Sequence, residues 1–187
     1  GAAEVTYGAI AGWDVSRVDD MSGTCCPSEG FFPAAFNAQI GGWDTSRVTK
    51  MDGTFYGASA FNSELAWDTS KVANMEYTFY ESHTFDQPLG WDTSKVMMMQ
   101  ATFMYAAKIN QPLDWDTSSV TRMDRTFDAR AFNSELVWDT SSVTDMMWTF
   151  AGATTFNQPL AWDTSQVTNM ESTFYDAGAF NQQLVWD

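Results

Sequence analysis

The sequence has few of the residues on which catalytic and metal sites depend. Its 187 residues include one histidine, His83, and two cysteines, which are adjacent at Cys25 and Cys26. A Ser or Cys nucleophile needs a neighbouring general base, and this chain offers a single histidine for that role. Two adjacent cysteines have the spacing of neither a zinc site nor a disulfide framework. A glycine-rich phosphate loop is also missing. We therefore expect no enzyme activity, no metal site and no cofactor. For Cys25 and Cys26, free or packed thiols, a vicinal disulfide and a bond to another chain all stay open.

Positive charge is scarce as well. Nine Lys and Arg stand against 24 Asp and Glu, and the formal net charge is −15. Such a chain repels nucleic acid phosphates and anionic membranes, and no apolar run approaches the ~18 residues of a membrane span. Because no charged, apolar leader follows Gly1, we interpret the chain as a processed product, an excised segment or an expressed fragment. Neither nucleic acid binding nor membrane insertion is expected, whereas basic partners and divalent cations stay possible.

A repeat runs through the whole chain. Trp-Asp pairs recur at intervals of 30, 24, 24, 24, 23, 24 and 24 residues, with tryptophans at Trp13, Trp43, Trp67, Trp91, Trp115, Trp138, Trp162 and Trp186. A fixed period of this size predicts a solenoid, in which each unit buries its apolar side against its neighbours. We divide the chain into an N-terminal cap with an irregular first repeat, residues 1–42, and six regular repeats of the same domain, residues 43–187.

Two apolar spacings recur within each repeat. Val48, Met51 and Phe55 are three and four residues apart, which is a helical period, and the preceding Asp-Thr-Ser supplies helix-capping side chains. Leu65 and Trp67 alternate, as in a strand. We therefore predict an α/β solenoid that resembles leucine-rich repeats, with a short parallel strand and a short helix in each coil of about 24 residues; an all-β solenoid is the alternative. The residue missing from the 23-residue interval is placed in the loop after the helix. One coil's predicted inward positions are Val120, Met123, Phe127, Ala129, Phe132, Leu136 and Trp138.

The repeat also resembles a known family. The run from Phe156 to Phe174, Phe-Asn-Gln-Pro-Leu-x-Trp-Asp-Thr-Ser-x-Val-Thr-x-Met-x-x-Thr-Phe, is similar to the ~25-residue repeat of bacterial surface lipoproteins and wall-anchored adhesins. The same repeat occurs in marine algae and is commonly grouped with BspA-type leucine-rich repeats. The resemblance implies an extracellular or cell-surface location and a role in adhesion or recognition, without enzyme activity.

Stacked coils turn each repeated polar residue into a column. An aspartate column invites a calcium hypothesis, but turn formation is the preferred interpretation because no glycine-rich calcium loop accompanies it. An asparagine column is expected to bind the backbone of adjacent coils. These structural ladders comprise Asp44, Asp68, Asp92, Asp116, Asp139 and Asp163, and Asn62, Asn110, Asn133, Asn157 and Asn181. A threonine column at the buried phenylalanines is expected to bond the preceding turn, although a regular threonine array could also bind ice.

Aromatic side chains and one methionine occupy positions that the predicted helix leaves exposed. A row of such residues along one edge is typical of surfaces that contact sugars or proteins; a contact surface and partly buried packing both stay open. The candidate contact residues are Tyr56, Tyr77, Tyr80, Met104, Trp148 and Tyr175.

The chain stops directly after a predicted strand, and an uncapped strand can pair with another copy. We therefore predict head-to-tail association into filaments through the ends at Ile10, Trp13, Leu184, Val185 and Trp186. The predicted function is a non-enzymatic extracellular scaffold or adhesive module, whose partners are copies of itself, surface proteins or glycans. The alternative is a carbohydrate-binding or, less favoured, ice-binding module.

Overall fold

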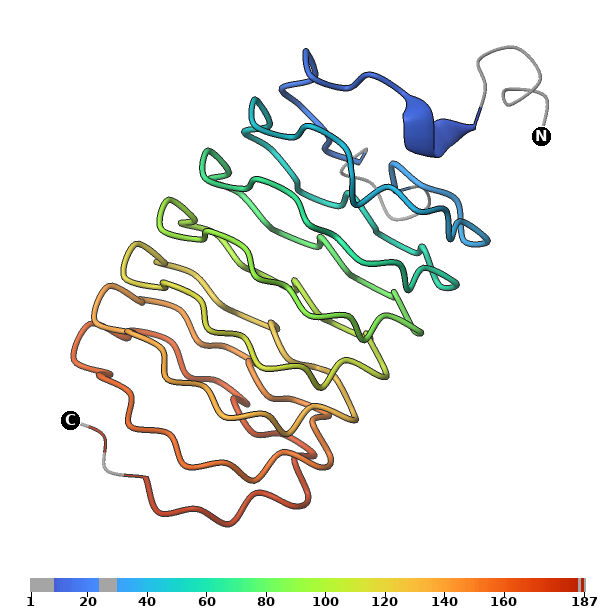
Figure 1. Cartoon of the computed structure of the whole chain (residues 1–187). Coiled ribbons are helices and arrows are strands. Elements are labelled where there is room, and N and C mark those ends of the chain that lie inside the picture. The colour runs from blue at the N-terminus through green and yellow to red at the C-terminus, as the bar shows by residue number, and fades with distance from the viewer. Residues whose placement is uncertain (1–8, 24–29, 185, 187) are drawn as a thin grey trace.

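The computed structural model describes residues 9–23, 30–184 and 186. The chain winds in successive coils that stack along one axis, and the first and last described coils lie at opposite ends of the stack (Figure 1). Each regular coil corresponds to one sequence repeat. The stack is continuous across residues 42 and 43, because the Trp43 indole Nε1 donates a hydrogen bond to the Ile10 carbonyl at 3.1 Å.

The predicted α/β solenoid is wrong. In the described part of the chain the one helix is the short 3-10 helix η1, Ile10–Gly12, and no extended strand or sheet forms. That helix cannot cross a membrane, being far too short. Adjacent coils instead pair in parallel at single residues, seven positions after each Trp. These isolated bridges join Asp20 to Lys50, Lys50 to Asn74, Asn74 to Met98, Met98 to Arg122, Arg122 to Asp145, and Asp145 to Asn169.

The expected helix from Val48 to Ala58 is a series of overlapping β-turns. The N–H groups of Thr54, Tyr56 and Ala58 each donate to the carbonyl three residues before them. The alternate N–H groups, those of residues 51, 53, 55 and 57, donate to the next coil at 2.7 to 3.2 Å. No helix can bond this way, because its N–H groups all bond within the same segment. A series of turns still places an apolar residue inward every three or four positions, which explains the misleading period.

Backbone dihedrals confirm the turn geometry. Gly53 and Gly57 have φ of +63° and +66°, and they occupy the third positions of turns 51–54 and 55–58. A positive φ at the third position defines type II turns and usually requires glycine. Other coils place non-glycine residues there, including Tyr77, Ala101 and Trp148 with φ between +51° and +60°. The left-handed conformation is unfavourable for such side chains, so contacts with adjacent coils must impose it.

A column of buried threonines stabilises these turns. Thr102 Oγ1 lies 2.7 Å from the Met99 carbonyl of its own coil and 3.0 Å from the Met75 carbonyl of the preceding coil. The same paired contacts are made by Thr54, Thr78, Thr126, Thr149 and Thr173. These threonine hydroxyls lie inside the molecule and therefore form no surface array for ice.

The opposite side of each coil is extended. From Phe61 to Thr69 side chains alternate strictly between buried and exposed, as the strand prediction for Leu65 to Trp67 required. Within the described segments, however, backbone bonds do not join these stretches between regular coils. Side chains connect them instead: Trp91 Nε1 donates to the Leu65 carbonyl at 3.3 Å, and Thr69 Oγ1 donates to the Asp92 carbonyl at 2.9 Å.

The core consists of aligned columns of identical side chains. Parallel tryptophan rings in successive coils lie with centroids 6.1 to 6.5 Å apart, and phenylalanines of the column from Phe55 to Phe174 lie 5.2 to 5.9 Å apart. All seven inward positions predicted for the coil from Val120 to Trp138 are buried. The prediction of which residues face the core is therefore confirmed, although the backbone that positions them differs from the expected one.

Candidate functional site

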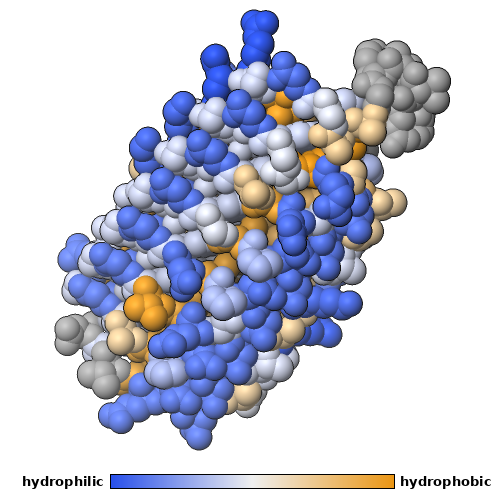
Figure 2. Space-filling view, viewed as in Figure 1, coloured by the Kyte–Doolittle hydropathy of each residue, from blue (hydrophilic) through white to orange (hydrophobic). Residues whose placement is uncertain are grey.

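The exposed aromatic residues gather along one edge of the stack, which we call the aromatic edge. It consists of the residues 10, 13 and 14 positions after each coil's Trp, where the type II turns form the corners of the coils. Its larger members are Tyr56, Tyr77, Tyr80, Met104, Tyr105, Arg125, Trp148 and Tyr175. Figure 2 shows one face of the stack, on which apolar surface runs between rows of hydrophilic side chains; its orange colour marks aliphatic and other strongly hydrophobic residues and does not mark the tyrosines of the aromatic edge.

Four tyrosines form one continuous cluster on this edge. The rings of Tyr56 and Tyr80 stack with centroids 4.5 Å apart, and Tyr77 and Tyr105 approach Tyr80 edge-on at 5.9 and 5.5 Å. Partial burial, together with nearby Tyr56 and Glu81, raises the pKa of Tyr80 to about 12. All three rings around Tyr80 therefore surround a neutral phenol at physiological pH.

A second aromatic cluster lies three coils further along the stack. The Trp148 and Tyr175 rings are 5.6 Å apart, and the Arg125 guanidinium carbon lies 5.6 Å from the Trp148 ring centroid in a cation–π arrangement. Tyr175 is 63% exposed, which is the largest exposure of any aromatic residue named on this edge. Both clusters therefore present aromatic surface to solvent.

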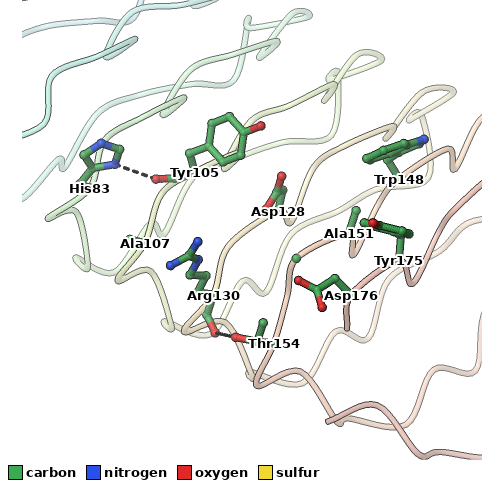
Figure 3. A pocket seen from close by; sticks show the side chains of 11 residues that line it. His83, Tyr105, Ala107, Asp128, Arg130, Trp148, Ala151, Thr154, Tyr175 and Asp176 are labelled. Carbon is green, nitrogen blue, oxygen red and sulfur yellow. Dashed lines mark hydrogen bonds between the residues drawn. The ribbon is translucent and has the colours of Figure 1, made fainter. Parts of the chain in front are cut away.

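A groove of about 740 Å³ separates the two clusters (Figure 3). Tyr105 lines one side, and Trp148 and Tyr175 line the other. Polar side chains reach into the space between them, with Asp128 located between Tyr105 and Trp148 in the view. The remaining lining residues are His83, Ala107, Arg130, Ala151, Gly152, Thr154 and Asp176.

The groove lies at the repeat that is one residue short. Its turn series ends early, because the Ala129 N–H bonds the Phe127 carbonyl at 2.6 Å and the corner residue of the other coils is missing. Asp128 takes the column position that Tyr56, Tyr80 and Tyr175 occupy elsewhere. The expected location of the missing residue, between Phe127 and Phe132, agrees with this geometry.

Asp128 is the one half-buried carboxylate in the groove lining. Its partial burial raises its pKa, and the positive charges of Arg130 and Arg125 act in the opposite direction. Within the described part of the chain no group donates a hydrogen bond to this carboxylate. His83 is anchored differently, with Nδ1 lying 2.9 Å from the Tyr105 carbonyl. The groove thus combines aromatic walls with an acceptor that a bound molecule could use.

The candidate contact residues predicted from sequence fall into both clusters. Tyr56, Tyr77 and Tyr80 belong to the first cluster, Trp148 and Tyr175 belong to the second, and Met104 is half-buried between them. The contact role itself stays a prediction. Sequence reasoning missed Tyr105, Asp128 and Arg130, and it treated His83 as an ordinary surface residue. The signal available in the sequence was the 23-residue interval, which marks the coil beneath the groove.

The residues named as structural ladders make repeated local bonds. Each aspartate of the column accepts the N–H of the serine two residues on, at 2.8 to 3.1 Å, and these bonds to serine lower the aspartate pKa values. In the other column a side-chain oxygen accepts the N–H of the equivalent residue one coil on, at 2.7 to 3.0 Å. This ladder runs from Asn37 through Asn62, Asp86, Asn110, Asn133 and Asn157 to Asn181.

The predicted assembly ends lie on the first and last coils. Ile10 and Trp13 line a hollow of about 670 Å³ together with Val18, Met21 and Phe31, and Leu184 and Trp186 are half-buried on the last coil. Val185, Cys25 and Cys26 lie outside the described residues. Association of copies through these ends stays a prediction. In the described ranges, no three His, Cys, Asp or Glu side chains are grouped as metal ligands.

The fold and its ladders define a class of stacked-repeat proteins, and comparison with protein families agrees. The chain belongs to the family described as Mycoplasma protein of unknown function, DUF285, whose model matches residues 1–114, 28–137 and 113–187. Three overlapping matches over one chain are what a repeat produces. No curated protein and no solved structure matches the chain.

Proposed function

We propose that the protein is a non-enzymatic scaffold of the cell surface or extracellular space, which adheres to its partners through the aromatic edge. One observation carries this proposal: the repeated polar columns bond within or between coils, while the aromatic edge varies from coil to coil and faces solvent. Tyr77, Tyr105 and Tyr175 are 44%, 43% and 63% exposed. Exposed tyrosine and tryptophan are enriched where proteins contact partners.

The architecture suits such a role. Stacking holds the aromatic side chains of successive coils in fixed positions along one edge, so no separate loop has to be ordered for each of them. A tyrosine side chain is rigid and therefore loses little conformational entropy when it binds a partner. The resemblance of the repeat to those of bacterial surface proteins supports the extracellular location. The net charge of −15 favours neutral or basic partners over anionic ones.

An adhesion assay tests the proposal. Beads coated with the whole chain are passed over arrays of glycans and of extracellular matrix proteins, and retention under flow is measured. The test variant changes Tyr77, Tyr105 and Tyr175 together to serine. The control variant changes Val137 to serine, because Val137 is 85% exposed but lies in the extended Leu–Trp side of its coil.

The expected result is retention of wild-type and control beads on at least one surface, with loss of retention for the triple variant. Retention that survives the triple variant unchanged would place the contact elsewhere on the molecule. A chain that is retained on no surface would not be an adhesive module, and the proposal would fall.

A further inference from the structure

Several departures from the repeat meet at the groove of the shortened coil. The corner residue after Asp128 is missing, and the tyrosine column is interrupted by Asp128 and by Ala151. Gly152 leaves room for the Asp128 carboxylate, because a Cβ at that position would collide with it. The deletion alone would leave a small gap at this corner of the stack. The small residues Ala151 and Gly152 beside it widen the gap into a groove of about 740 Å³.

The distance between the two walls of the groove indicates the size of the ligand that it can hold. Tyr105 belongs to the coil that begins at Trp91, and Tyr175 belongs to the coil that begins at Trp162, three coils further on. Paired parallel segments lie roughly 4.8 Å apart, so along the stack Tyr105 stands about 10 Å from Trp148, two coils on, and about 14 Å from Tyr175, three coils on. This length suits a short chain of rings better than a single ring or a planar heterocycle.

The polar groups between the walls are a mixed set of hydrogen-bonding partners. Asp128 has acceptor capacity that no donor in the described segments uses, and the Arg130 guanidinium beside it offers donors in a planar fork. Asp176 lies below Tyr175 in the same view and adds a second carboxylate. The groove thus offers both acceptors and donors, with aromatic surface at both ends.

We propose that this groove binds a neutral oligosaccharide, an inference that rests on the proposed recognition function of the aromatic edge. A sugar ring has C–H faces that pack on aromatic rings and a rim of hydroxyl groups that both donate and accept hydrogen bonds. The exposed Tyr175 ring receives a C–H face, and Trp148, which packs against Tyr175, holds that ring in place and borders the bound sugar. One sugar hydroxyl donates to Asp128, and another accepts from Arg130.

Charged ligands fit the same groove less well. A quaternary ammonium group would need the face of Trp148, where the Arg125 guanidinium already lies 5.6 Å from the ring centroid, and like charges repel. An anionic sugar would meet the carboxylates of Asp128 and Asp176 as well as the overall charge of −15. A neutral ligand avoids both costs.

Titration of the whole chain with defined probes tests the proposal. Isothermal calorimetry is run with cellotetraose, laminaritetraose and mannotetraose as neutral probes, with sialyllactose as the anionic probe and with choline as the cationic probe. Two variants alter the groove: Trp148→Ala removes an aromatic wall, and a glycine inserted between Asp128 and Ala129 restores the 24-residue period of the other coils. Met97→Ala is the control, because it removes a large side chain that is exposed and lies outside both the groove and the aromatic edge.

The expected result is binding of at least one neutral tetrasaccharide, weakened roughly tenfold or more by both groove variants and unchanged by Met97→Ala. Thermal unfolding followed by circular dichroism confirms that each variant is folded. The glycine insertion keeps the proposal testable if Trp148→Ala does not fold.

Three results would overturn the proposal: no binding of any neutral probe at millimolar concentration, binding of only sialyllactose or choline, or binding that both groove variants leave intact. The adhesion assay separates this failure from failure of the proposed function. If beads still adhere through Tyr77, Tyr105 and Tyr175 but no neutral sugar binds the groove, the aromatic edge has another partner and only the sugar assignment is lost.

Discussion

The two sides of each coil are joined to their neighbours by different chemistry. On the turn side the backbone pairs directly, as where the Phe55 N–H donates to the Thr78 carbonyl at 2.8 Å. On the extended side a side chain supplies at least one partner of each connecting bond, as where Trp115 Nε1 donates to the Leu89 backbone carbonyl at 3.0 Å. Backbone bonds tolerate any outward residue, and the bridge column indeed holds Asp, Lys, Asn, Met and Arg. Side-chain bonds restrict which residue can make them, in agreement with Trp-Asp-Thr in the regular coils from Trp43 to Trp162; the first coil has Val15 in place of Thr, and Trp162 Nε1 has no hydrogen-bond partner among the described residues.

Truncation of a core tryptophan should have the largest effect. Trp115 is 4% exposed and stacks between Trp91 and Trp138 at 6.4 and 6.1 Å. Trp115→Ala is expected to lower the free energy of unfolding by about 3–5 kcal/mol, because it removes a large buried ring. Urea denaturation measures the change. Trp115→Phe should cost less, since it keeps an aromatic ring and loses the bond to the Leu89 carbonyl. A loss under about 1 kcal/mol for Trp115→Ala would show that the extended side is not held by this column.

Loss of one buried threonine hydroxyl tests the turn side. Thr102→Val keeps the shape of the side chain but leaves the Met75 and Met99 carbonyls without this donor. The expected loss is about 0.5–1.5 kcal/mol in the free energy of unfolding, the net contribution of a hydrogen bond, because the Met75 and Met99 carbonyls keep the hydroxyls of Thr78 and Thr126 as donors. Thr121→Val is the control, because Thr121 is exposed and its bond to the Met97 carbonyl is 3.2 Å long; it should change stability by less than about 0.5 kcal/mol. Equal effects of the two substitutions would mean that burial does not distinguish the two hydroxyls.

Two glycine substitutions compare the backbones of the two sides. Gly53 has φ of +63° in a turn, whereas Gly90 has no positive φ and lies on the extended side with open space around its Cα. Gly53→Ala is expected to destabilise by about 1 kcal/mol, because alanine disfavours the left-handed conformation. Gly90→Ala should be neutral or slightly stabilising, since it restricts only the unfolded chain. Thermal unfolding of both variants checks the difference, and a stable Gly53→Ala protein would contradict the turn assignment.

The aspartate column at the corner between the two sides should give the smallest effect, visible mainly as a pH dependence. Hydrogen bonds from the Ser94 hydroxyl and N–H lower the pKa of Asp92 below its ordinary value of 3.8, and six other aspartates of the column behave alike. A lowered folded-state pKa stabilises the protein above the unfolded pKa, and this contribution is lost as the pH falls through the folded pKa.

The urea midpoint should therefore fall as the pH is lowered from about 6 to about 3. Ser94→Ala should reduce this slope, because it removes one of the two bonds to Asp92. Asp128 contributes with the opposite sign, since burial raises its pKa and protonation relieves that cost. A midpoint that does not change with pH would show that the serine bonds to the column do not favour the folded state.

The sequence predicted the inward residues correctly because the apolar spacing records which side chains avoid water. Val120, Met123, Phe127, Leu136 and Trp138 were all assigned to the core and all are buried. The asparagine and aspartate columns were also assigned to backbone bonds of the kind now observed. The aromatic residues of the edge were recognised as a row, but not as two clusters on either side of a groove.

The helix prediction failed for a specific physical reason. A spacing of three and four residues is compatible with a helix and equally with overlapping type II turns, because both place every third or fourth side chain on one face. What separates them is the partner of each N–H group, and for Phe55 that partner is Thr78, in the next coil. Eleven described residues have positive φ, and eight of them are not glycine. The residue types therefore did not predict where the turns lie.

The sequence by itself determined the repeat, its length, the residues that face inward and the site of the single deletion. All four follow from the intervals of 23 or 24 residues between equivalent positions of the chain. Only the tertiary structure decided the backbone conformation of each coil, since the hydrogen bonds that impose positive φ on Tyr77 or Trp148 come from adjacent coils. It also decided that Asp128, Trp148 and Tyr175, from three successive coils, line one groove. Stacking brings residues about 24 positions apart into contact. The local sequence pattern does not indicate which of these neighbours will line a common groove.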